Sequence, residues 1–303
     1  MGKHDLLAET LPTTMSRLAL GTVQFGRRYG IANTSGQVDT KSAAAILERA
    51  RISGVDTLDT AVGYGDSESC LGEVGVFSWR VITKLPRVPE DITCVSDWVE
   101  AQVCDSLRRL RIARLDGLLL HRPSDLLGPA GAGLIGAFDS LKARGLIRVA
   151  GISIYNPAEL DVICAVWRPD LVQAPCNVLD RRLIHSGWLE RLHGWGVQVH
   201  VRSLFLQGLL LMPADRRPSW FDPWSALLLR WTNWCEENRA TPLQETLAFV
   251  EAIPWVERLV VGVDSVDQWN EILAASDAKG HVPPDDLFSD DLELIEPSRW
   301  KLS

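Results

Sequence analysis

Short apolar runs alternate with longer amphipathic stretches along most of the chain. The apolar runs are rich in valine, isoleucine and leucine, which is typical of parallel strands that are covered on both faces. They predict strands over residues 17–22, 55–60, 80–84, 116–121, 147–152, 170–174, 197–202 and 258–262. The amphipathic stretches predict helices over 41–53, 67–75, 97–111, 132–144, 157–166, 181–194, 223–238 and 242–252.

This alternation of strand and helix predicts an α/β fold, and eight such units favour a single-domain (β/α)8 TIM barrel. A doubly wound sheet is the alternative, but it predicts a glycine-rich phosphate turn after its first strand. The stretch GTVQFGRRYG carries no GxGxxG pattern, so the barrel is favoured. We expect an N-terminal tail over 1–15, the barrel over 16–275, and a C-terminal tail over 276–303 whose extra helices pack on the barrel.

Composition narrows the classes of function. The chain has 303 residues and a net charge of −8, which disfavours a nucleic-acid groove because phosphate binding needs concentrated positive charge. No apolar stretch reaches the length of a membrane helix, and the N-terminus lacks the apolar core of a secretory signal. The six cysteines form no CxxC pair, which indicates free thiols and no metal site. We therefore expect a cytoplasmic protein with no membrane or nucleic-acid partner.

The predicted strands end in polar side chains. Barrel enzymes act at the carboxyl ends of their strands, so these ends are candidate site positions. Asp59, Lys84 and His121 end three successive strands, and Tyr64 lies in the loop after the first of them. Each of these residues alone has an ordinary structural interpretation, as a cap, an ion-pair partner or a loop contact. Their succession at neighbouring strand ends indicates one shared site.

The four side chains have a common use in carbonyl reduction, which needs hydride at carbon and a proton at oxygen. A tyrosine supplies the proton, but its ordinary pKa of roughly 10 is too high for the best transfer near neutrality. A neighbouring ammonium favours tyrosinate, and a carboxylate holds and compensates that ammonium. A histidine donates to the carbonyl oxygen and orients it. Tyr64, Lys84, Asp59 and His121 fill these roles.

With these residues in place, the sequence resembles the aldo-keto reductases over roughly residues 16–275. The motifs LALGTVQFG, DTLDTAVGYG, ITKL, LLLHRP, GLIRVAGIS, VQAPCN and VVGVDSVDQWNEIL occur in the family's order. The resemblance implies a barrel that binds NADP(H) in extended form, without a Rossmann domain, and reduces aldehydes or ketones. It implies a catalytic tetrad of Asp59, Tyr64, Lys84 and His121.

The resemblance also implies a set of cofactor contacts. They fall on Gly21, Thr22, Asp59, Ser153, Gln173, Arg202, Ser203, Phe205, Gly208, Gly262, Val263, Asp264 and Gln268. Three positions depart from the family's pattern: Ile154 replaces an asparagine, Arg202 replaces the tyrosine that commonly stacks on nicotinamide, and Asp264 lies where a cation often pairs with the 2′-phosphate. NADP(H) is favoured on family grounds, with NAD(H) as the alternative.

The substrate pocket has candidates in the loop after the first strand and in the tetrad. Gln24, Tyr64 and His121 are expected to contact substrate, and Phe25 and Tyr29 are further candidates. The stretch RSLFLQGLLLM resembles a bacterial subgroup associated with sugar metabolism, so a small-molecule substrate with a sugar-like or other polar carbonyl is expected. The protein is expected to be a monomer or a weak homo-oligomer.

Two other functions use the same residues. The barrel serves as a cofactor-binding, redox-sensing regulatory subunit in some relatives of this kind, and an intact tetrad does not exclude that role. Alternatively, Lys84 forms a Schiff base with a carbonyl substrate, since a desolvated lysine at a strand end is a nucleophile. Steady turnover of simple aldehydes favours the reductase over the regulatory subunit, and borohydride trapping on Lys84 favours the Schiff-base enzyme.

Overall fold

The strands close into a barrel. The structure is a computed structural model that describes residues 17–276 and 280–302, so the expected N-terminal tail over 1–15 lies outside the described residues. Each strand pairs in parallel with the next, and the first pairs with the last, Leu20 lying beside both Leu58 and Val261. The strands are β1 (Leu18–Gly21), β2 (Thr57–Asp59), β3 (Arg80–Leu85), β4 (Leu115–Leu120), β5 (Ile147–Ser153), β6 (Leu171–Pro175), β7 (Gln198–Arg202) and β8 (Arg258–Gly262). The predicted (β/α)8 barrel is confirmed.

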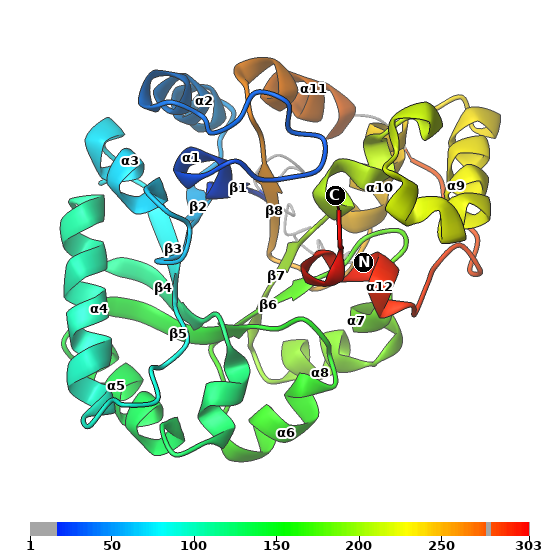
Figure 1. Cartoon of the computed structure of the whole chain (residues 1–303). Coiled ribbons are helices and arrows are strands. Elements are labelled where there is room, and N and C mark those ends of the chain that lie inside the picture. The colour runs from blue at the N-terminus through cyan, green and yellow to red at the C-terminus, as the bar shows by residue number, and fades with distance from the viewer. Residues whose placement is uncertain (1–16, 277–279, 303) are drawn as a thin grey trace, which may run out of the picture.

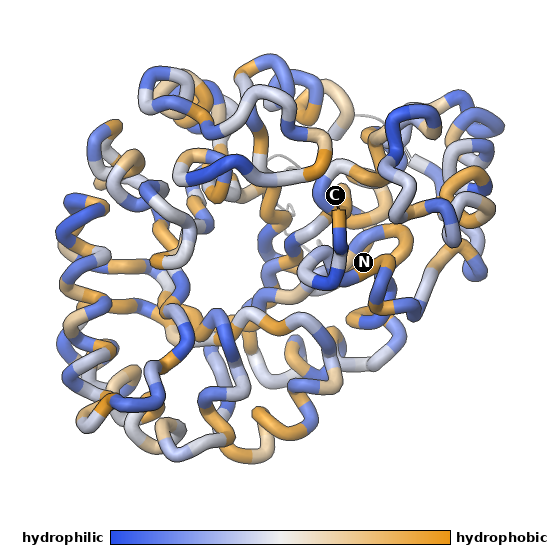
Figure 2. The backbone as a smooth tube through the Cα atoms, in the orientation of Figure 1, coloured by the Kyte–Doolittle hydropathy of each residue, from blue (hydrophilic) through white to orange (hydrophobic). Residues whose placement is uncertain are grey.

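Helices surround the barrel as an outer ring (Figure 1). The longer ones are α2 (Thr40–Ile52), α3 (Ser67–Val74), α4 (Val95–Leu110), α5 (Gly131–Ala143), α6 (Glu159–Val166), α9 (Ser225–Glu237), α10 (Pro242–Glu251) and α11 (Val266–Ser276). Figure 2 shows hydrophobic positions recurring along these helices between hydrophilic ones. The main core therefore lies between the strands and the helices that cover them.

Helix α2 illustrates how the sequence forms these elements. Asp39 caps it, since its carboxylate accepts a hydrogen bond from the Ser42 amide at 2.8 Å. Ala43, Ile46, Leu47 and Ala50 are buried, and their spacing of three and four residues gives one apolar face. That face packs on the barrel and leaves the charged residues of the helix in solvent.

The helical pattern differs from the prediction in three places. The expected helix over 181–194 is two short helices, α7 (Arg182–His185) and α8 (Trp188–Gly194), because Gly187 adopts a left-handed φ of 73° between them. The short helix α1 (Val23–Gly26) follows β1 directly and was not predicted. The last unit is closed by α11, which the predicted set of helices did not include.

The interior of the barrel is filled by side chains that alternate along the strands. Ile82, Leu119, Val149 and Leu171 form a small buried cluster from four neighbouring strands. Lys84 follows Ile82 by two residues on β3, so its side chain points to the same face of the sheet. The alternation thus places a buried lysine in the layer directly above this apolar cluster.

The described part of the C-terminal segment packs beside α9. Leu287, Leu294 and Ile295 form a second hydrophobic cluster with Leu228 and Trp231. This segment contains α12 (Leu292–Ile295) and the 3-10 helix η6 (Pro297–Arg299), and other 3-10 helices occur at η2 (Pro123–Leu127), η3 (Leu206–Leu211), η4 (Ala214–Arg216) and η5 (Ser219–Trp224). The boundaries at residues 16 and 275 stay a prediction. Within the described residues, no helix combines the length and apolar character needed to cross a membrane.

Candidate active site

A cavity of about 550 Å³ opens at the carboxyl ends of the strands. It is bounded by loops after β1, β2, β4, β5, β7 and β8 and by residues 297–298 of the C-terminal segment. The predicted site residues that line it are Gly21, Thr22, Gln24, Tyr29, Asp59, Tyr64, His121, Arg202, Ser203, Phe205, Gly208, Gly262, Val263, Asp264 and Gln268. Phe25 is instead fully buried in the main hydrophobic core.

An ion pair lies at the bottom of this cavity. The Lys84 Nζ donates to both Asp59 carboxylate oxygens, at 2.8 and 2.7 Å, and to the Thr60 carbonyl at 3.0 Å. Lys84 is completely buried and Asp59 nearly so. Burial opposes the charged form of Lys84, but the attraction of Asp59 and its hydrogen bond outweigh burial, and the pKa of Lys84 is raised. The ammonium is therefore retained at neutral pH.

Ser153 and Gln173 continue this buried network. They lie side by side at the ends of β5 and β6. The Gln173 Nε2 donates to Asp59 Oδ1 at 2.7 Å, and the Ser153 hydroxyl donates to the Gln173 Oε1 at 3.3 Å. We call these four residues, Asp59, Lys84, Ser153 and Gln173, the floor of the site. Their predicted role as nicotinamide contacts stays a prediction.

Tyr64 is held above the floor by a tight turn. Its amide donates to the Ala61 carbonyl at 3.0 Å, and its carbonyl accepts from the Ser67 amide at 3.2 Å. The Lys84 Nζ lies 5.1 Å from the centre of the Tyr64 ring. A side chain at Gly26 would collide with the Tyr64 carbonyl, so a glycine is required for α1 to approach this turn.

His121 approaches Tyr64 edge-on, with ring centres 5.8 Å apart and planes 80° apart. Burial, together with the nearby positive charges of Lys84, Arg202 and Arg27, lowers the pKa of His121 to about 3. The imidazole is therefore neutral near pH 7. Burial also raises the pKa of Tyr29, which keeps that neighbouring phenol protonated.

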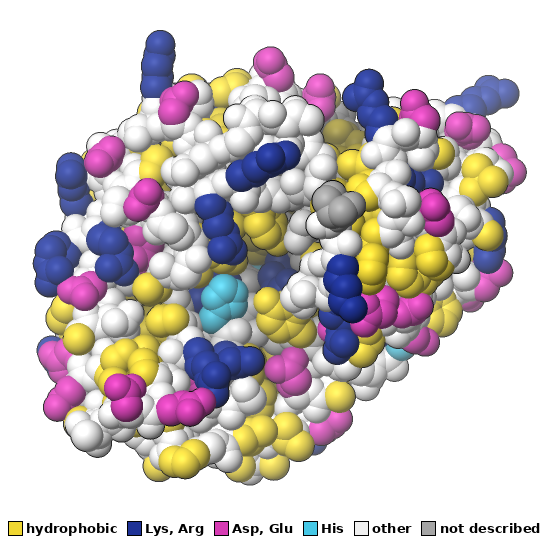
Figure 3. Space-filling view, in the orientation of Figure 1, with side chains coloured by type: hydrophobic (Ala, Val, Ile, Leu, Met, Phe, Trp, Pro, Cys, Tyr) yellow, Lys and Arg dark blue, Asp and Glu magenta, His cyan; other side chains and the backbone are white. Residues whose placement is uncertain are grey.

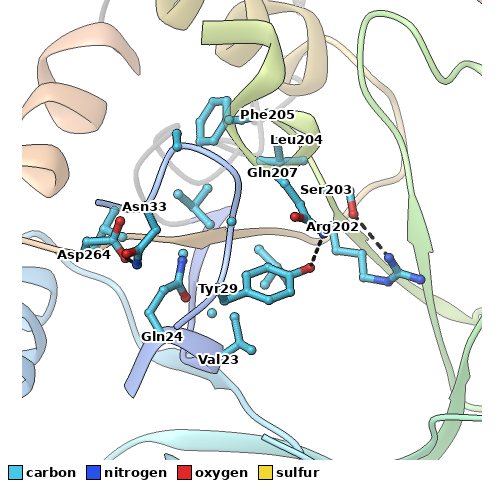
Figure 4. A pocket seen from close by; sticks show the side chains of 18 of the residues that line it. Val23, Gln24, Tyr29, Asn33, Arg202, Ser203, Leu204, Phe205, Gln207 and Asp264 are labelled. Carbon is cyan, nitrogen blue, oxygen red and sulfur yellow. Dashed lines mark hydrogen bonds between the residues drawn. The ribbon is translucent and has the colours of Figure 1, made fainter. Parts of the chain in front are cut away.

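The loop after β1 reaches across the mouth of the barrel to two other loops. The side-chain amide of Asn33 donates to Asp264 Oδ1 at 2.9 Å. The backbone amide of Ile31 donates to the backbone carbonyl of Gln207 at 3.2 Å. The Gln207 side chain also donates to the Tyr29 hydroxyl at 3.3 Å. Figure 4 shows Asn33 and Asp264 at one end of the cavity, Arg202 at the other, and Tyr29 between them.

The loop after β7 is strained where it borders the cavity. Ser203, Leu206 and Gln207 are not glycines, yet they adopt left-handed φ angles of 61°, 48° and 54°. Such conformations cost about 1–3 kcal/mol each and persist where surrounding structure enforces them, often at binding sites. We call the loops 27–36 and 203–211 together with Asp264 the rim of the site.

Asn33 and Gln207 were missed from the sequence. Asn33 lies far from any strand end, and only the loop's path brings it to Asp264. Gln207 stands beside the predicted Phe205 and Gly208, but a single glutamine in an apolar stretch gives no signal of a tyrosine partner. Tyr155, which also lines the cavity, directly follows the predicted Ser153 and Ile154 and was readable only as loop.

The sequence profile of the Aldo/keto reductase family matches residues 17–282. This chain belongs to that family. It is an oxidoreductase of the barrel type. The four residues predicted as its catalytic tetrad, Asp59, Tyr64, Lys84 and His121, lie at one end of the barrel, and their catalytic roles stay a prediction.

Individual relatives agree with the family assignment. The chain is 26% identical over 305 residues to an uncharacterized oxidoreductase of Mycobacterium tuberculosis, covering 93% of this chain and 91% of that protein. It is 30% identical over 206 residues to rat aflatoxin B1 aldehyde reductase member 2, covering 63% of this chain and 52% of that protein. An aldo-keto reductase of Bacillus halodurans has the same fold, with a TM-score of 0.69, 23% identity and 88% of each chain covered.

Proposed function

We propose that this protein reduces an aldehyde or ketone to the alcohol with a reduced nicotinamide cofactor, NADP(H) being favoured over NAD(H), and that Tyr64 is the proton donor. The observation that carries the proposal is the buried Lys84–Asp59 pair beneath Tyr64, with a neutral His121 against the edge of the tyrosine ring. Membership of the aldo/keto reductase family supports the reaction class.

The residues present fit a dinucleotide. The cavity volume of about 550 Å³ lies within the usual range of cofactor pockets, roughly 300–1,000 Å³. Gln24 is buried at the cavity wall beside Gly262, and its side-chain oxygen has no hydrogen-bond partner among the described residues. Buried polar atoms are normally paired, so this acceptor is suited to a bound molecule. Ser203, Gly262, Asp264 and Gln268 would border the phosphates and the adenosine.

Each residue of the tetrad then has a defined task. A bound reduced nicotinamide would supply the hydride to the carbonyl carbon. Tyr64 transfers its hydroxyl proton to the carbonyl oxygen, and neutral His121 donates a hydrogen bond to that oxygen and orients it. The Lys84 ammonium stabilises the phenolate left on Tyr64, while Asp59 fixes the ammonium in place. Solvent at the open mouth returns the proton to Tyr64.

The Tyr64→Phe variant tests this assignment because it keeps the ring and removes the proton. General acid catalysis contributes about 100- to 10,000-fold, so we expect a loss of kcat in that range with 4-nitrobenzaldehyde and NADPH. The cofactor dissociation constant, measured by fluorescence, should change only a few-fold. Tyr29→Phe is the matched control, since it removes a phenol from the same cavity but leaves the group above Lys84 intact. Equal turnover by wild type and Tyr64→Phe would refute the mechanism.

A further inference from the structure

Apart from Asp59, which is paired with Lys84 at the bottom, the charged side chains of the cavity divide between its two ends. Asp264 and Glu271 line the end next to α11, whereas Arg27 and Arg202 line the end next to Tyr64 and His121. The Arg27 guanidinium lies 5.9 Å from the centre of the Tyr64 ring. Figure 3 shows Lys and Arg side chains gathered around the hollow on this face. The reacting centre is therefore placed at the positive end of the cavity.

Arg202 is held rigidly at this end. Its guanidinium lies 4.7 Å from the centre of the Tyr155 ring and donates to the Ile154 carbonyl at 2.9 Å and to the Ser203 hydroxyl at 3.2 Å. Tyr155 is fixed in turn, because its carbonyl accepts from the Arg182 guanidinium at 3.1 Å. A guanidinium has five N–H donors, so Arg202 keeps donors for a ligand in an orientation that needs no further ordering.

Among the described residues, no acidic side chain is paired with either of these two positive charges. Across residues 17–276 and 280–302, neither Arg27 nor Arg202 forms an ion pair with an acidic side chain, whereas Lys84 is matched by Asp59. His121 adds no charge near neutral pH, because its pKa is lowered to about 3 chiefly by burial. Clefts lined by one sign of charge concentrate ligands of the opposite sign.

We propose that the substrate of this reductase carries an anionic group, a carboxylate or a phosphate, and that Arg202 and Arg27 bind this group while its carbonyl lies against Tyr64 and His121. The inference rests on the proposed function and names the substrate class for it. Guanidinium groups suit both anions, since their planar donors match carboxylate and phosphate oxygens in pairs. On this assignment Arg202 serves the substrate, whereas the resemblance places it among the cofactor contacts.

The test compares matched substrates that differ in one charge. The carboxylate arm uses 4-carboxybenzaldehyde against its methyl ester, and the phosphate arm uses glyceraldehyde 3-phosphate against glyceraldehyde. We expect wild type to favour the anionic member in at least one arm by about ten- to a hundred-fold in kcat/KM, the size of a charge-assisted hydrogen bond. This preference should shrink as ionic strength rises.

Arginine variants locate the source of the preference. Arg202→Gln and Arg27→Gln should each reduce the ratio of anionic to neutral kcat/KM several-fold, and the arm that responds identifies the anion. Arg114→Gln is the matched control: Arg114 is exposed, directly precedes β4 at the amino end of the barrel, and does not line the cavity. Its ratio should equal that of wild type. Melting temperatures show whether Arg202→Gln remains folded. If it does not, the substrate ratio of Arg27→Gln still tests the proposal, because Arg27 is exposed and its replacement should leave the fold intact.

Three outcomes would overturn the inference, and they differ from failure of the proposed function. The first is turnover of the neutral carbonyls by wild type with no preference for either anion. The second is a preference that both arginine variants leave unchanged. The third is a weaker NADPH dissociation constant in the variants with the substrate ratio intact, which would assign the arginines to the cofactor phosphates. Absence of turnover with every carbonyl would instead refute the reductase function itself.

Discussion

The floor and the rim of the site are built on different principles. The floor residues Asp59, Lys84, Ser153 and Gln173 lie at strand ends, are almost completely buried, and are joined by hydrogen bonds of 2.7–3.3 Å. The rim is made of loops that meet through a few contacts: the side chain of Asn33 with Asp264, and Gln207 with the Tyr29 hydroxyl and the Ile31 amide. The floor is thus set by the barrel itself, whereas the rim depends on loop paths and is free to differ in charge and shape.

The largest expected effect is on the floor. Lys84→Met should reduce kcat at least as much as Tyr64→Phe, about 100- to 10,000-fold, because it removes the charge that stabilises the phenolate. It also leaves Asp59 buried without a counter-ion, which typically costs about 3–5 kcal/mol of unfolding free energy. Kinetics and urea unfolding measure the two effects.

A double variant separates charge from packing on the floor. Asp59→Asn combined with Lys84→Met removes both charges of the pair, so it should recover part of the lost stability while activity stays low. A single Lys84→Met variant with normal stability and normal turnover would show that the Lys84–Asp59 ion pair is needed neither for the fold nor for catalysis.

A second expected effect follows from a buried histidine beside the floor. His200 is on β7, where it lies beside Gln173 of β6. Its Nδ1 has no hydrogen-bond partner among the described residues. Burial, with the positive charges of Arg258, Lys84 and Arg148, lowers the pKa of His200 to about 3. The unfolded chain has a histidine pKa of about 6.5, so it binds more protons than the folded protein at mildly acidic pH. His200 therefore contributes a loss of stability as pH falls from 6.5 towards 3.

The variant His200→Gln isolates this contribution. Between pH 7 and pH 5 the unfolding free energy of wild type should fall by about 2 kcal/mol more than that of His200→Gln, as proton linkage for one histidine requires. Urea unfolding at the two pH values measures the difference. Parallel curves for the two proteins would mean that water or a partner reaches His200, and that the interior below the floor is less closed than its burial indicates.

The sequence was informative about the floor for the same reason that the floor is rigid. Apolar runs of the barrel end in Asp59, Lys84 and His121, and the alternation of side chains along a strand fixes where each of them points. Tyr64 was readable because glycines bracket its turn. The rim was less readable, since the contact between Asn33 and Asp264 joins residues that no local pattern relates. The break between α7 and α8 was missed because one glycine in an amphipathic stretch is compatible with a continuous helix.

The smallest expected effect concerns the rim and the choice of cofactor. On the proposed cofactor assignment, Asp264 lies where a cation would pair with the 2′-phosphate of NADP(H), and its carboxylate accepts a hydrogen bond from the Asn33 side chain. Burial raises the pKa of Asp264, which shows that its environment disfavours negative charge. Replacing it in Asp264→Arg should favour NADPH over NADH by about ten- to a hundred-fold, the size of a charge-assisted hydrogen bond, and by less where solvent screens the site. The measurement is the ratio of the two dissociation constants at one ionic strength.

Asn33→Ala is the control for this rim substitution, since it breaks the same hydrogen bond without adding a charge. It should weaken both cofactors alike, because losing one loop contact opens the cavity for either. A ratio that shifts equally in Asn33→Ala and Asp264→Arg would assign cofactor choice to loop position. A ratio that moves in neither variant would place Asp264 away from the adenosine ribose. If the NADPH-to-NADH ratio shifts in Asp264→Arg and not in Asn33→Ala, the charge at position 264 sets the cofactor preference. The charges of the rim, unlike those of the floor, can then be changed without loss of the barrel.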